Sequence, residues 1–386
     1  MGHRFHPSVL REYDIRGVVG KTLGVEDARA IGRCFATVMR RAGLRTVAVG
    51  RDGRLSSAML EEALGEGLLA SGAQVVRIGL GPTPMLSYRE VPEKDVQGGI
   101  QITGSHNPAD HNGFKMVLEG RPFFGADIQR LGRRAEAGDW IDGTGSCQRR
   151  EILDRYVDSL IEGLRGIGED RLAGLRIGWD AGNGAAGPAL ERLVTRLPGV
   201  HHLLHTKVDG TFPNHHPDPT IDSNLADLRT LVARERLHFG VAFDGDGDRI
   251  GVVDAHGRAI QGDQLMAIYA EDLLKIVPGS LVIADVKASG ALFDRIAALG
   301  GRPLMWKSGH SQIKSKMKET GALLGGEMSG HVFFAHEFPG YDDALYAVVR
   351  LIAATVRLGR SVTELHDAMP RLPSTPELRF HVDEAR

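Results

Sequence analysis

The stretch TVAVGRDGRLSSAMLEEALGEGLLASGAQVVRI, residues 46–78, decides the expected fold of this chain. It opens with a short apolar run typical of a buried strand, and a polar loop with Ser56 or Ser57 as a helix cap follows. A helix to about Ala70 and a second strand over 74–78 complete a β-α-β unit. Such units join parallel strands through right-handed crossovers, so the stretch predicts an α/β fold.

The same succession of strand, small polar loop and helix returns twice along the chain. Residues 175–180 and 280–285 are apolar strand candidates, and each is followed by a glycine-containing loop and a helical segment. A length of 386 residues exceeds what one hydrophobic core usually serves. We therefore predict three successive, similar, mixed α/β domains at residues 1–151, 152–254 and 255–368.

Composition excludes several classes of protein. The net charge of -2 argues against nucleic acid or an anionic membrane as the main partner. The longest apolar stretch, 344–358, is interrupted by arginine and is too short to span a bilayer. The N-terminus lacks the apolar run of a signal peptide, and Cys34 and Cys147 form no Cys-x-x-Cys pair. These features predict a soluble cytoplasmic protein without a disulfide framework or a thiolate zinc site.

The segment FDGDGDR, residues 243–249, carries the strongest chemical signal. Its three carboxylates alternate with glycine: Asp244, Asp246 and Asp248. Like charges this close are unfavourable unless a cation neutralises them, and oxygen ligands favour Mg²⁺ or Ca²⁺. An EF-hand is excluded because its sixth position would be Arg249 and its twelfth Ala255. The alternative is a solvated acidic turn, but the apolar flanks predict a hairpin between buried strands.

A serine ends another strand-like run in ITGSHNP, residues 102–108. The hydroxyl of Ser105 on a tight loop can serve as a nucleophile or as a carrier of phosphate. Lys115 adds a cation near the same loop, and a phosphoserine would carry nearly two negative charges. Taken alone, a Ser-Gly turn is more often structural.

Four segments together resemble the α-D-phosphohexomutase family, and within it the bacterial phosphomannomutase/phosphoglucomutases. They are EYDIRG at 12–17, TGSHNP at 103–108 with NGFK at 112–115, DGDGDR at 244–249, and GGEMSGH at 325–331. The resemblance reaches to about residue 368. It implies that the three domains surround a central cleft and supply, in order, a phosphoserine, a metal site and sugar recognition.

The resemblance also implies a reaction. Phosphorylated Ser105 gives its phosphoryl group to a hexose 1-phosphate, the bound hexose 1,6-bisphosphate reorients, and the other phosphate returns to Ser105 as hexose 6-phosphate leaves. The implied cofactors are Mg²⁺ and a hexose 1,6-bisphosphate activator, and the partners are small sugar phosphates. Met328 resembles the version that accepts both glucose and mannose phosphates.

Residue roles follow from the same resemblance. The implied catalytic residues are Ser105, His106, Lys115, Arg16 and His331. The implied metal ligands are Ser105, Asp244, Asp246 and Asp248. The implied substrate contacts are Tyr13, Arg16, Asn112, Lys115, Arg249, Lys287, Gly309, His310, Glu327, Ser329 and His331. Without the resemblance, Arg16 would equally suit a surface cation, and the two histidines ordinary loop positions.

Two rival interpretations are kept. Residues 182–187, GNGAAG, fit the G-x-G-x-x-G pattern, and Asp209 lies downstream, as in an NAD-dependent dehydrogenase. Asp209 stands in a turn-rich segment, however, and the aspartate loop stays unexplained. The second rival is a weakly active or non-catalytic sugar-phosphate-binding fragment.

The second rival rests on the end of the sequence. Residues 369–386 are expected to be a linker, with one strand over 377–382, that begins the family's fourth, phosphate-binding domain. The rest of that domain is expected to be missing. Such a chain should keep metal binding and serine phosphorylation and lose much of its turnover, because remote phosphate binding contributes to positioning.

Overall fold

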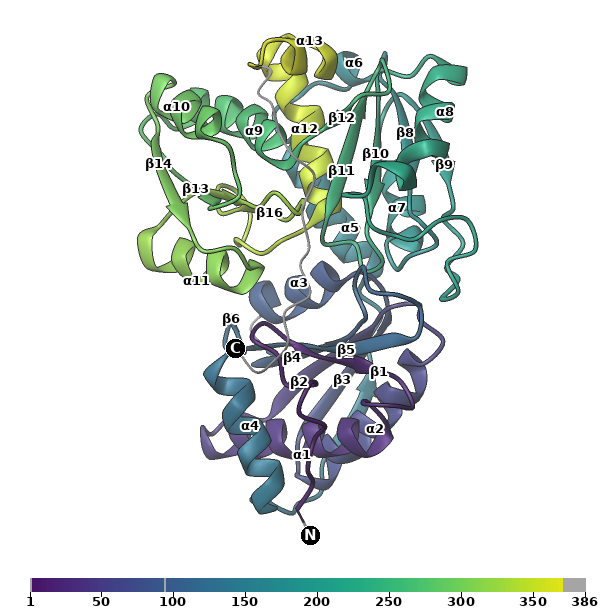
Figure 1. The fold of residues 1–386 in the computed structure, drawn as a ribbon, viewed down its shortest axis with the longest axis vertical. Coiled ribbons are helices and arrows are strands. Elements are labelled where there is room, and N and C mark those ends of the chain that lie inside the picture. The colour runs from purple at the N-terminus through teal and green to yellow at the C-terminus, as the bar shows by residue number, and fades with distance from the viewer. Residues whose placement is uncertain (1, 94, 371–386) are drawn as a thin grey trace.

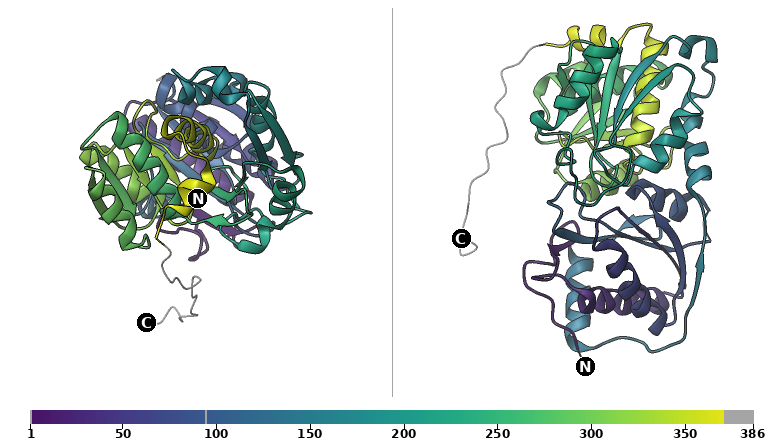
Figure 2. Two further views of the ribbon diagram at one scale, coloured as in Figure 1. Left: turned by 90° about the horizontal axis from the view of Figure 1, so that it is seen from above. Right: turned by 90° about the vertical axis from the view of Figure 1, so that its right-hand side faces the viewer.

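The computed structural model describes residues 2–93 and 95–370. These residues form three lobes, each built on its own sheet (Figure 1). Figure 2 shows the first lobe at one end of the molecule and the other two side by side at the opposite end. The strand predicted over 377–382, and the predicted linker beyond residue 370, lie outside the described residues.

The first lobe confirms the β-α-β prediction. Its strands are β1 (Ile15–Val18), β2 (Thr46–Arg51), β3 (Gln74–Leu80), β4 (Gly98–Ile102), β5 (His111–Leu118), β6 (Arg121–Pro122) and β7 (Ser146–Arg149). Its helices are α1 (Val25–Arg41), α2 (Ser57–Ala70), α3 (Thr83–Glu93) and α4 (Ala126–Ala137). The strand order is β1-β5-β4-β2-β3-β7, with β6 beside β5. Strands β2, β3, β4 and β7 pair in parallel, and β5 runs antiparallel to β4 and β1.

The second lobe contains the predicted hairpin. Its strands, in the order β12-β11-β10-β8-β9, are β8 (Arg176–Asp180), β9 (Val200–Leu204), β10 (Phe239–Phe243), β11 (Ile250–Asp254) and β12 (Ala259–Ile260). Its helices are α5 (Leu153–Ile161), η1 (Glu162–Leu164), α6 (Glu169–Leu172), α7 (Gly187–Val194), η2 (Asp222–Leu225) and α8 (Ala226–Glu235). Antiparallel pairing of β10 with β11 places residues 244–249 at the hairpin turn. The sheet continues to Ile260, beyond the boundary expected at residue 254, because β12 pairs with β11.

The third lobe contains the smallest of the three sheets and a buried, largely apolar helix at residues 344–358. Its strands, in the order β14-β13-β15-β16, are β13 (Leu281–Asp285), β14 (Arg302–Trp306), β15 (Leu324–Gly326) and β16 (Val332–Phe334). Its helices are α9 (Gly262–Ile276), α10 (Gly290–Ala298), α11 (His310–Thr320), α12 (Ala344–Leu358) and α13 (Val362–Asp367). Across the described ranges, no helix has both the length and the apolar composition needed to cross a membrane.

Two main cores hold the lobes. The second and third lobes share one continuous core, and α12 lies between them (Figure 1), where it contacts both α5 and α9. Trp179 of the second lobe and Tyr269 of the third belong to this core, and each is at most 2% exposed. The first lobe has a further core around Phe35 and Phe114, while Met85 of its helix α3 belongs to the core of the other two lobes. One continuous core therefore reaches all three lobes, and the first lobe adds a core of its own.

Several functional segments predicted from the sequence follow the carboxyl ends of strands, whereas Arg16 lies within β1 and Lys115 within β5. Ser105 follows β4, the aspartate loop follows β10, Lys287 follows β13, and Glu327 follows β15. Parallel α/β sheets present their loops for ligands at this edge. Side-chain contacts between the lobes bring most of these strand ends together.

Candidate active site

Ser105 lies in a backbone conformation that fixes its hydroxyl. Its φ is 49°, in the left-handed region, and its N–H donates to Thr103 Oγ1 at 2.8 Å. The side chain is buried, with the residue only 2% exposed. Ser105 Oγ donates to Asp244 Oδ2 at 2.9 Å and lies 3.2 Å from His106 Nδ1. The hydroxyl of the first lobe thus touches the aspartate loop of the second.

The three aspartates of the hairpin turn are buried together, each at most 1% exposed. Lys115 of β5 donates through Nζ to Asp246 Oδ2 at 2.8 Å and also to Asp248. Burial and the two neighbouring carboxylates raise the pKa of Asp244 well above its ordinary value. Burial would also raise the pKa of Asp246, but the Lys115 ammonium outweighs burial and lowers it. The loop therefore concentrates negative charge that one ammonium only partly balances.

This loop fits a hard divalent cation. Asp246 Oδ1 and Asp248 Oδ1 are buried without a hydrogen-bond partner, so acceptor oxygens in the cluster have lone pairs to offer. The carboxylate oxygens lie within 4.8 Å of one another, and Ser105 Oγ adjoins them. An all-oxygen donor set of this kind suits Mg²⁺ and excludes a site built for soft metals.

Cations surround the same point. Arg16 is 5% exposed and donates to the carbonyl of Gly104 and to Asp14. Burial, with help from Arg249, Arg16 and Lys115, lowers the pKa of His106 to about 2, which keeps its imidazole neutral. The predicted residues Arg16, His106 and Lys115 are therefore gathered around Ser105.

The third lobe contributes His331 and its neighbours. Arg249 Nε donates to His331 Nε2 at 3.1 Å, so the ring proton of a neutral His331 resides on Nδ1. That Nδ1 lies 3.1 Å from Asp342 Oδ2. Asp342 also accepts from Lys314 Nζ at 2.7 Å, and the ring of His310 stacks on His331 with centroids 5.4 Å apart. His331 is thus held between an arginine and a carboxylate.

The sugar-recognition segment packs against the loop before α11. Glu327 is 5% exposed, and its Oε1 accepts the N–H of Gly309 while its Oε2 is buried without a partner. Burial raises the pKa of the Glu327 carboxyl. Tyr13 is 40% exposed and donates from its hydroxyl to the carbonyl of Ser308 at 3.1 Å. The first lobe therefore reaches the third lobe directly through Tyr13.

Three further predicted substrate contacts are Asn112, Ser329 and Lys287. Asn112 is fully buried, its amide donates to Ser56 and Ser57 at 2.9 Å, and its oxygen accepts the N–H of Gly113. These hydrogen bonds give Asn112 a supporting role beside the serine loop, and its substrate contact stays a prediction. Ser329 is half-buried, and Lys287 is exposed on the loop after β13. Their substrate contacts stay predictions.

Sequence reasoning missed the support beneath Ser105. Arg54, only 2% exposed, donates to four backbone carbonyls of the serine loop: those of Ser105, Asn107, Pro108 and His111. Asp52 accepts from Arg54 Nε at 3.2 Å and from the N–H of Gly104 at 3.0 Å. Thr83 of α3 donates to Asp246. The available signal was RDGR at the end of β2, a charged loop at the same sheet edge as Ser105.

The glycine loop of the rival dehydrogenase interpretation has a packing explanation. A Cβ at Gly187 would lie 1.9 Å from the carbonyl oxygen of Thr206, and one at Gly184 would lie 2.9 Å from that of Gly245. The N–H of Asp209 donates to the carbonyl of Asn183 at 3.0 Å. The glycines therefore allow close backbone contacts within the second lobe.

Comparisons with known proteins agree with this geometry. Three family descriptions match the chain: phosphoglucomutase/phosphomannomutase alpha/beta/alpha domain I at residues 8–142, domain II at 154–257 and domain III at 261–372. A phosphomannomutase/phosphoglucomutase of Pseudomonas aeruginosa is 44% identical over 377 residues, which are 98% of this chain and 80% of that protein.

Two further comparisons cover similar shares. A phosphoglucomutase of Neisseria gonorrhoeae is 42% identical across 97% of this chain and 81% of its own length. The crystal structure of a phosphoglucomutase/phosphomannomutase family protein from Burkholderia thailandensis superposes with a TM-score of 0.91 at 42% identity. That match covers 96% of this chain and 81% of the other.

The Arg54 contacts generate a prediction about local stability. In Arg54→Lys, a single ammonium cannot reach all four carbonyls, so the serine loop should open more often. We expect amide hydrogen exchange in residues 103–111 to be at least about tenfold faster, the equivalent of one lost hydrogen bond to a charged donor. Arg51→Lys is the matched control, because Arg51 is half-buried and pairs with Glu61. Equal exchange rates in the two variants would contradict the assigned role.

Proposed function

Because this chain belongs to the phosphoglucomutase/phosphomannomutase family, we propose that it interconverts hexose 1-phosphates and hexose 6-phosphates through a phosphoserine. The observation that carries the proposal is the 2.9 Å contact between Ser105 Oγ and Asp244 Oδ2. It joins a candidate phosphate carrier to a candidate cation site across two lobes. A dehydrogenase would have no use for this pairing.

Phosphoryl transfer proceeds here by positioning and charge neutralisation. In the first half-reaction, the bond between phosphorus and Ser105 Oγ breaks as the free hydroxyl oxygen of the hexose phosphate bonds to that phosphorus. In the second, the bond between phosphorus and the sugar oxygen of the other phosphate breaks as that phosphorus bonds to Ser105 Oγ, and the hexose 6-phosphate leaves after its freed oxygen takes back the proton removed in the first half-reaction. Arg16, Lys115 and the N–H groups of the serine loop stabilise the charge on the transferring oxygens.

The hydroxyl proton needs an acceptor, and we assign it to His331. The Nε2 of His331 has a lone pair that accepts a hydrogen bond from Arg249 in this structure. On the other side of the ring, Asp342 Oδ2 lies 3.1 Å from Nδ1. A carboxylate behind an imidazole orients the ring and stabilises the imidazolium that forms. Burial and the surrounding cations keep the pKa of His106 low, so His106 is a hydrogen-bonding neighbour of Ser105 and a poor base.

The proposed cation is Mg²⁺, held by Asp244, Asp246 and Asp248 with an oxygen on Ser105. When bound, it supplies positive charge to the phosphoryl oxygens as the bond to Ser105 breaks. The hexose 1,6-bisphosphate activator would restore the phosphoserine whenever the intermediate escapes. Both assignments rest on the all-oxygen donor set and on the chemistry of a phosphoserine cycle.

The proposed substrates are glucose and mannose phosphates. Glu327, with one buried oxygen free of partners, is placed to accept hydrogen bonds from sugar hydroxyls, and Ser329 stands two residues beyond it. Sites that hydrogen-bond hydroxyls discriminate strongly against sugars that lack them. A reducing, cytoplasmic compartment is also proposed, because Cys34 and Cys147 are both free thiols.

The first prediction concerns the phosphate carrier. Incubation of the chain with glucose 1,6-bisphosphate should add one phosphoryl group, seen by intact mass spectrometry, and Ser105→Ala should abolish both this addition and mutase turnover with either hexose 1-phosphate. Ser223→Ala is the matched control, because Ser223 is an exposed serine of the second lobe. Phosphoryl uptake by Ser105→Ala at the wild-type level would refute the proposal.

The second prediction concerns the cation. Chelation should stop phosphoryl uptake by Ser105, and added Mg²⁺ should restore it. Asp246→Asn should raise the Mg²⁺ concentration needed for half-maximal uptake by about tenfold or more, since it removes one charged ligand. Asp158→Asn, a change at an exposed aspartate of α5, should leave that concentration unaltered. Uptake that is insensitive to chelation would exclude a metal-dependent transfer.

The third prediction concerns sugar recognition. Glu327→Gln keeps an oxygen that can accept the N–H of Gly309, so the loop should stay in place, but it removes a charged acceptor. KM for the hexose 1-phosphate should rise about tenfold, the worth of one hydrogen bond to a charged group, with a smaller change in kcat. Glu319→Gln, on the exposed side of α11, is the control. An unchanged KM would remove Glu327 from the sugar site.

A further inference from the structure

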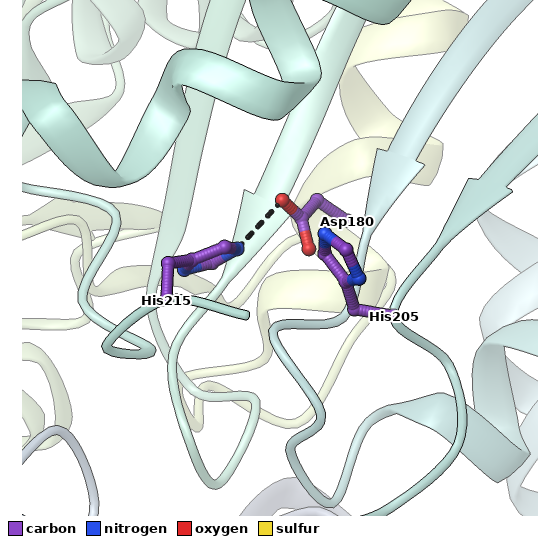
Figure 3. A group of neighbouring side chains, drawn as sticks. All are labelled: Asp180, His205 and His215. Carbon is purple, nitrogen blue, oxygen red and sulfur yellow. Dashed lines mark hydrogen bonds and ion pairs between the residues drawn. The ribbon is translucent and has the colours of Figure 1, made fainter. Parts of the chain in front are cut away.

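A second cluster of metal-ligating side chains lies in the second lobe, separate from the aspartate loop. Figure 3 shows the imidazoles of His205 and His215 beside the carboxylate of Asp180. One ligand atom from each residue lies within 4.8 Å of the ligand atoms of the other two. We propose that Asp180, His205 and His215 bind a zinc-class divalent cation, distinct from the Mg²⁺ of the phosphoryl-transfer site.

Three segments of the second lobe bring the cluster together. Asp180 is the last residue of β8, and its strand partner Leu204 ends β9 immediately before His205. His215 comes from the long connection between β9 and η2 and returns to within 2.9 Å of Asp180 Oδ2 through its Nε2. The N–H of Asn183 donates to the carbonyl of His205 at 2.8 Å and ties the loop after β8 to the same point. Sheet backbone therefore positions Asp180 and His205, and the connection after β9 brings His215 to them.

The hydrogen bonds of His215 orient it as a ligand. Its Nδ1 lies 3.0 Å from the carbonyl oxygen of His216, which can only accept, so Nδ1 carries a proton. This leaves Nε2 pointing at the carboxylate. Metal-ligating histidines commonly donate their other ring nitrogen to a backbone carbonyl in this way. Asp180 is held similarly, since its Oδ1 accepts the N–H of Gly182 at 2.8 Å.

The two imidazoles lie close to each other on the two sides of Asp180 (Figure 3). Their ring centroids are 5.4 Å apart, with the rings edge to face, and His205 Nε2 also lies 3.1 Å from Asp227 Oδ2. Two imidazolium ions this close would repel each other, whereas one divalent cation attracts the lone pairs of both rings. Asp227, at the exposed rim, is available as a fourth ligand or as a partner of a bound water.

The donor set selects the class of cation. Two imidazole nitrogens and one carboxylate oxygen suit Zn²⁺ and related transition metals, whereas Mg²⁺ favours oxygen alone. Zinc bonds of about 2.0–2.2 Å hold tetrahedral ligand atoms roughly 3.4 Å apart, so small rotations of the imidazoles suffice. The side chains of His205 and His215 are 16% and 13% exposed, which gives a cation a path from solvent.

Such a cation would stabilise the backbone that contacts the aspartate loop. It would join the ends of β8 and β9 to the connection that carries His215. The loop after β8 continues from this point to Ala185, whose N–H donates to the carbonyl of Gly245 within the aspartate loop at 2.9 Å. Binding should therefore stabilise the second lobe, by mass action on its folded state.

The test is a Zn²⁺ titration of the full chain, stripped of metals, in competition with a chromophoric chelator. The Asp246→Asn background weakens the oxygen site, so Zn²⁺ bound there contributes less. In this background we expect one tight equivalent of Zn²⁺, and His205→Ala or His215→Ala should weaken it more than about 100-fold, since even outer partners of ligands are worth about 10–100-fold. His256→Ala is the control, because His256 is exposed at the opposite end of the same sheet.

A second measurement does not depend on the histidine variants. Co²⁺ bound to the Asp246→Asn chain should show the intense visible absorption of a four- or five-coordinate site with imidazole ligands. Equal Zn²⁺ affinity in all variants, or a weak spectrum of six-coordinate Co²⁺ with oxygen ligands only, would overturn the proposal and leave His215 as the ion-pair partner of Asp180. Neither readout uses phosphoryl transfer, so the result is independent of the proposed mutase function.

Discussion

Burying three carboxylates at one hairpin turn is the constraint on which the rest of the site depends. Asp244, Asp246 and Asp248 are almost without solvent exposure, and isolated charges buried in this way are unstable without partners. Lys115 from the first lobe supplies one positive charge, and Ser105 Oγ donates one hydrogen bond. The two lobes are therefore held in register by the same charges that would bind the cation.

The fold serves this constraint by separating stability from chemistry. One core shared by the second and third lobes fixes the hairpin turn relative to His331 and Glu327. The first lobe packs part of its sheet and helix α3 into that core, adds a second core of its own, and contacts the other lobes through Ser105, Lys115 and Tyr13. Most of the side chains proposed to react lie on loops at strand ends. The packed sheets fix the positions of these loops.

The sequence identified those functional segments whose reactive residues are consecutive in the chain. FDGDGDR and ITGSHNP predicted the aspartate loop and the serine loop, and the structure places both at strand ends in contact with each other. The three α/β lobes followed from strand and helix periodicity. The residues that support the serine loop could not be found in this way, because Arg54 hydrogen-bonds to Ser105 across 51 positions of sequence. The hydrogen bonds of Asn112 to Ser56 and Ser57 could not be found for the same reason, because they join residues 55 and 56 positions apart.

The central claim is that one oxygen on Ser105 and one divalent cation are neighbours in the working protein. The most direct measurement is a crystal structure of the chain phosphorylated by glucose 1,6-bisphosphate and soaked in Mn²⁺, with the cation located by its anomalous scattering. The account predicts a single strong peak in contact with Asp244, Asp246, Asp248 and a phosphoryl oxygen on Ser105. A phosphoryl group on another residue, or a cation bound away from the hairpin turn, would contradict it.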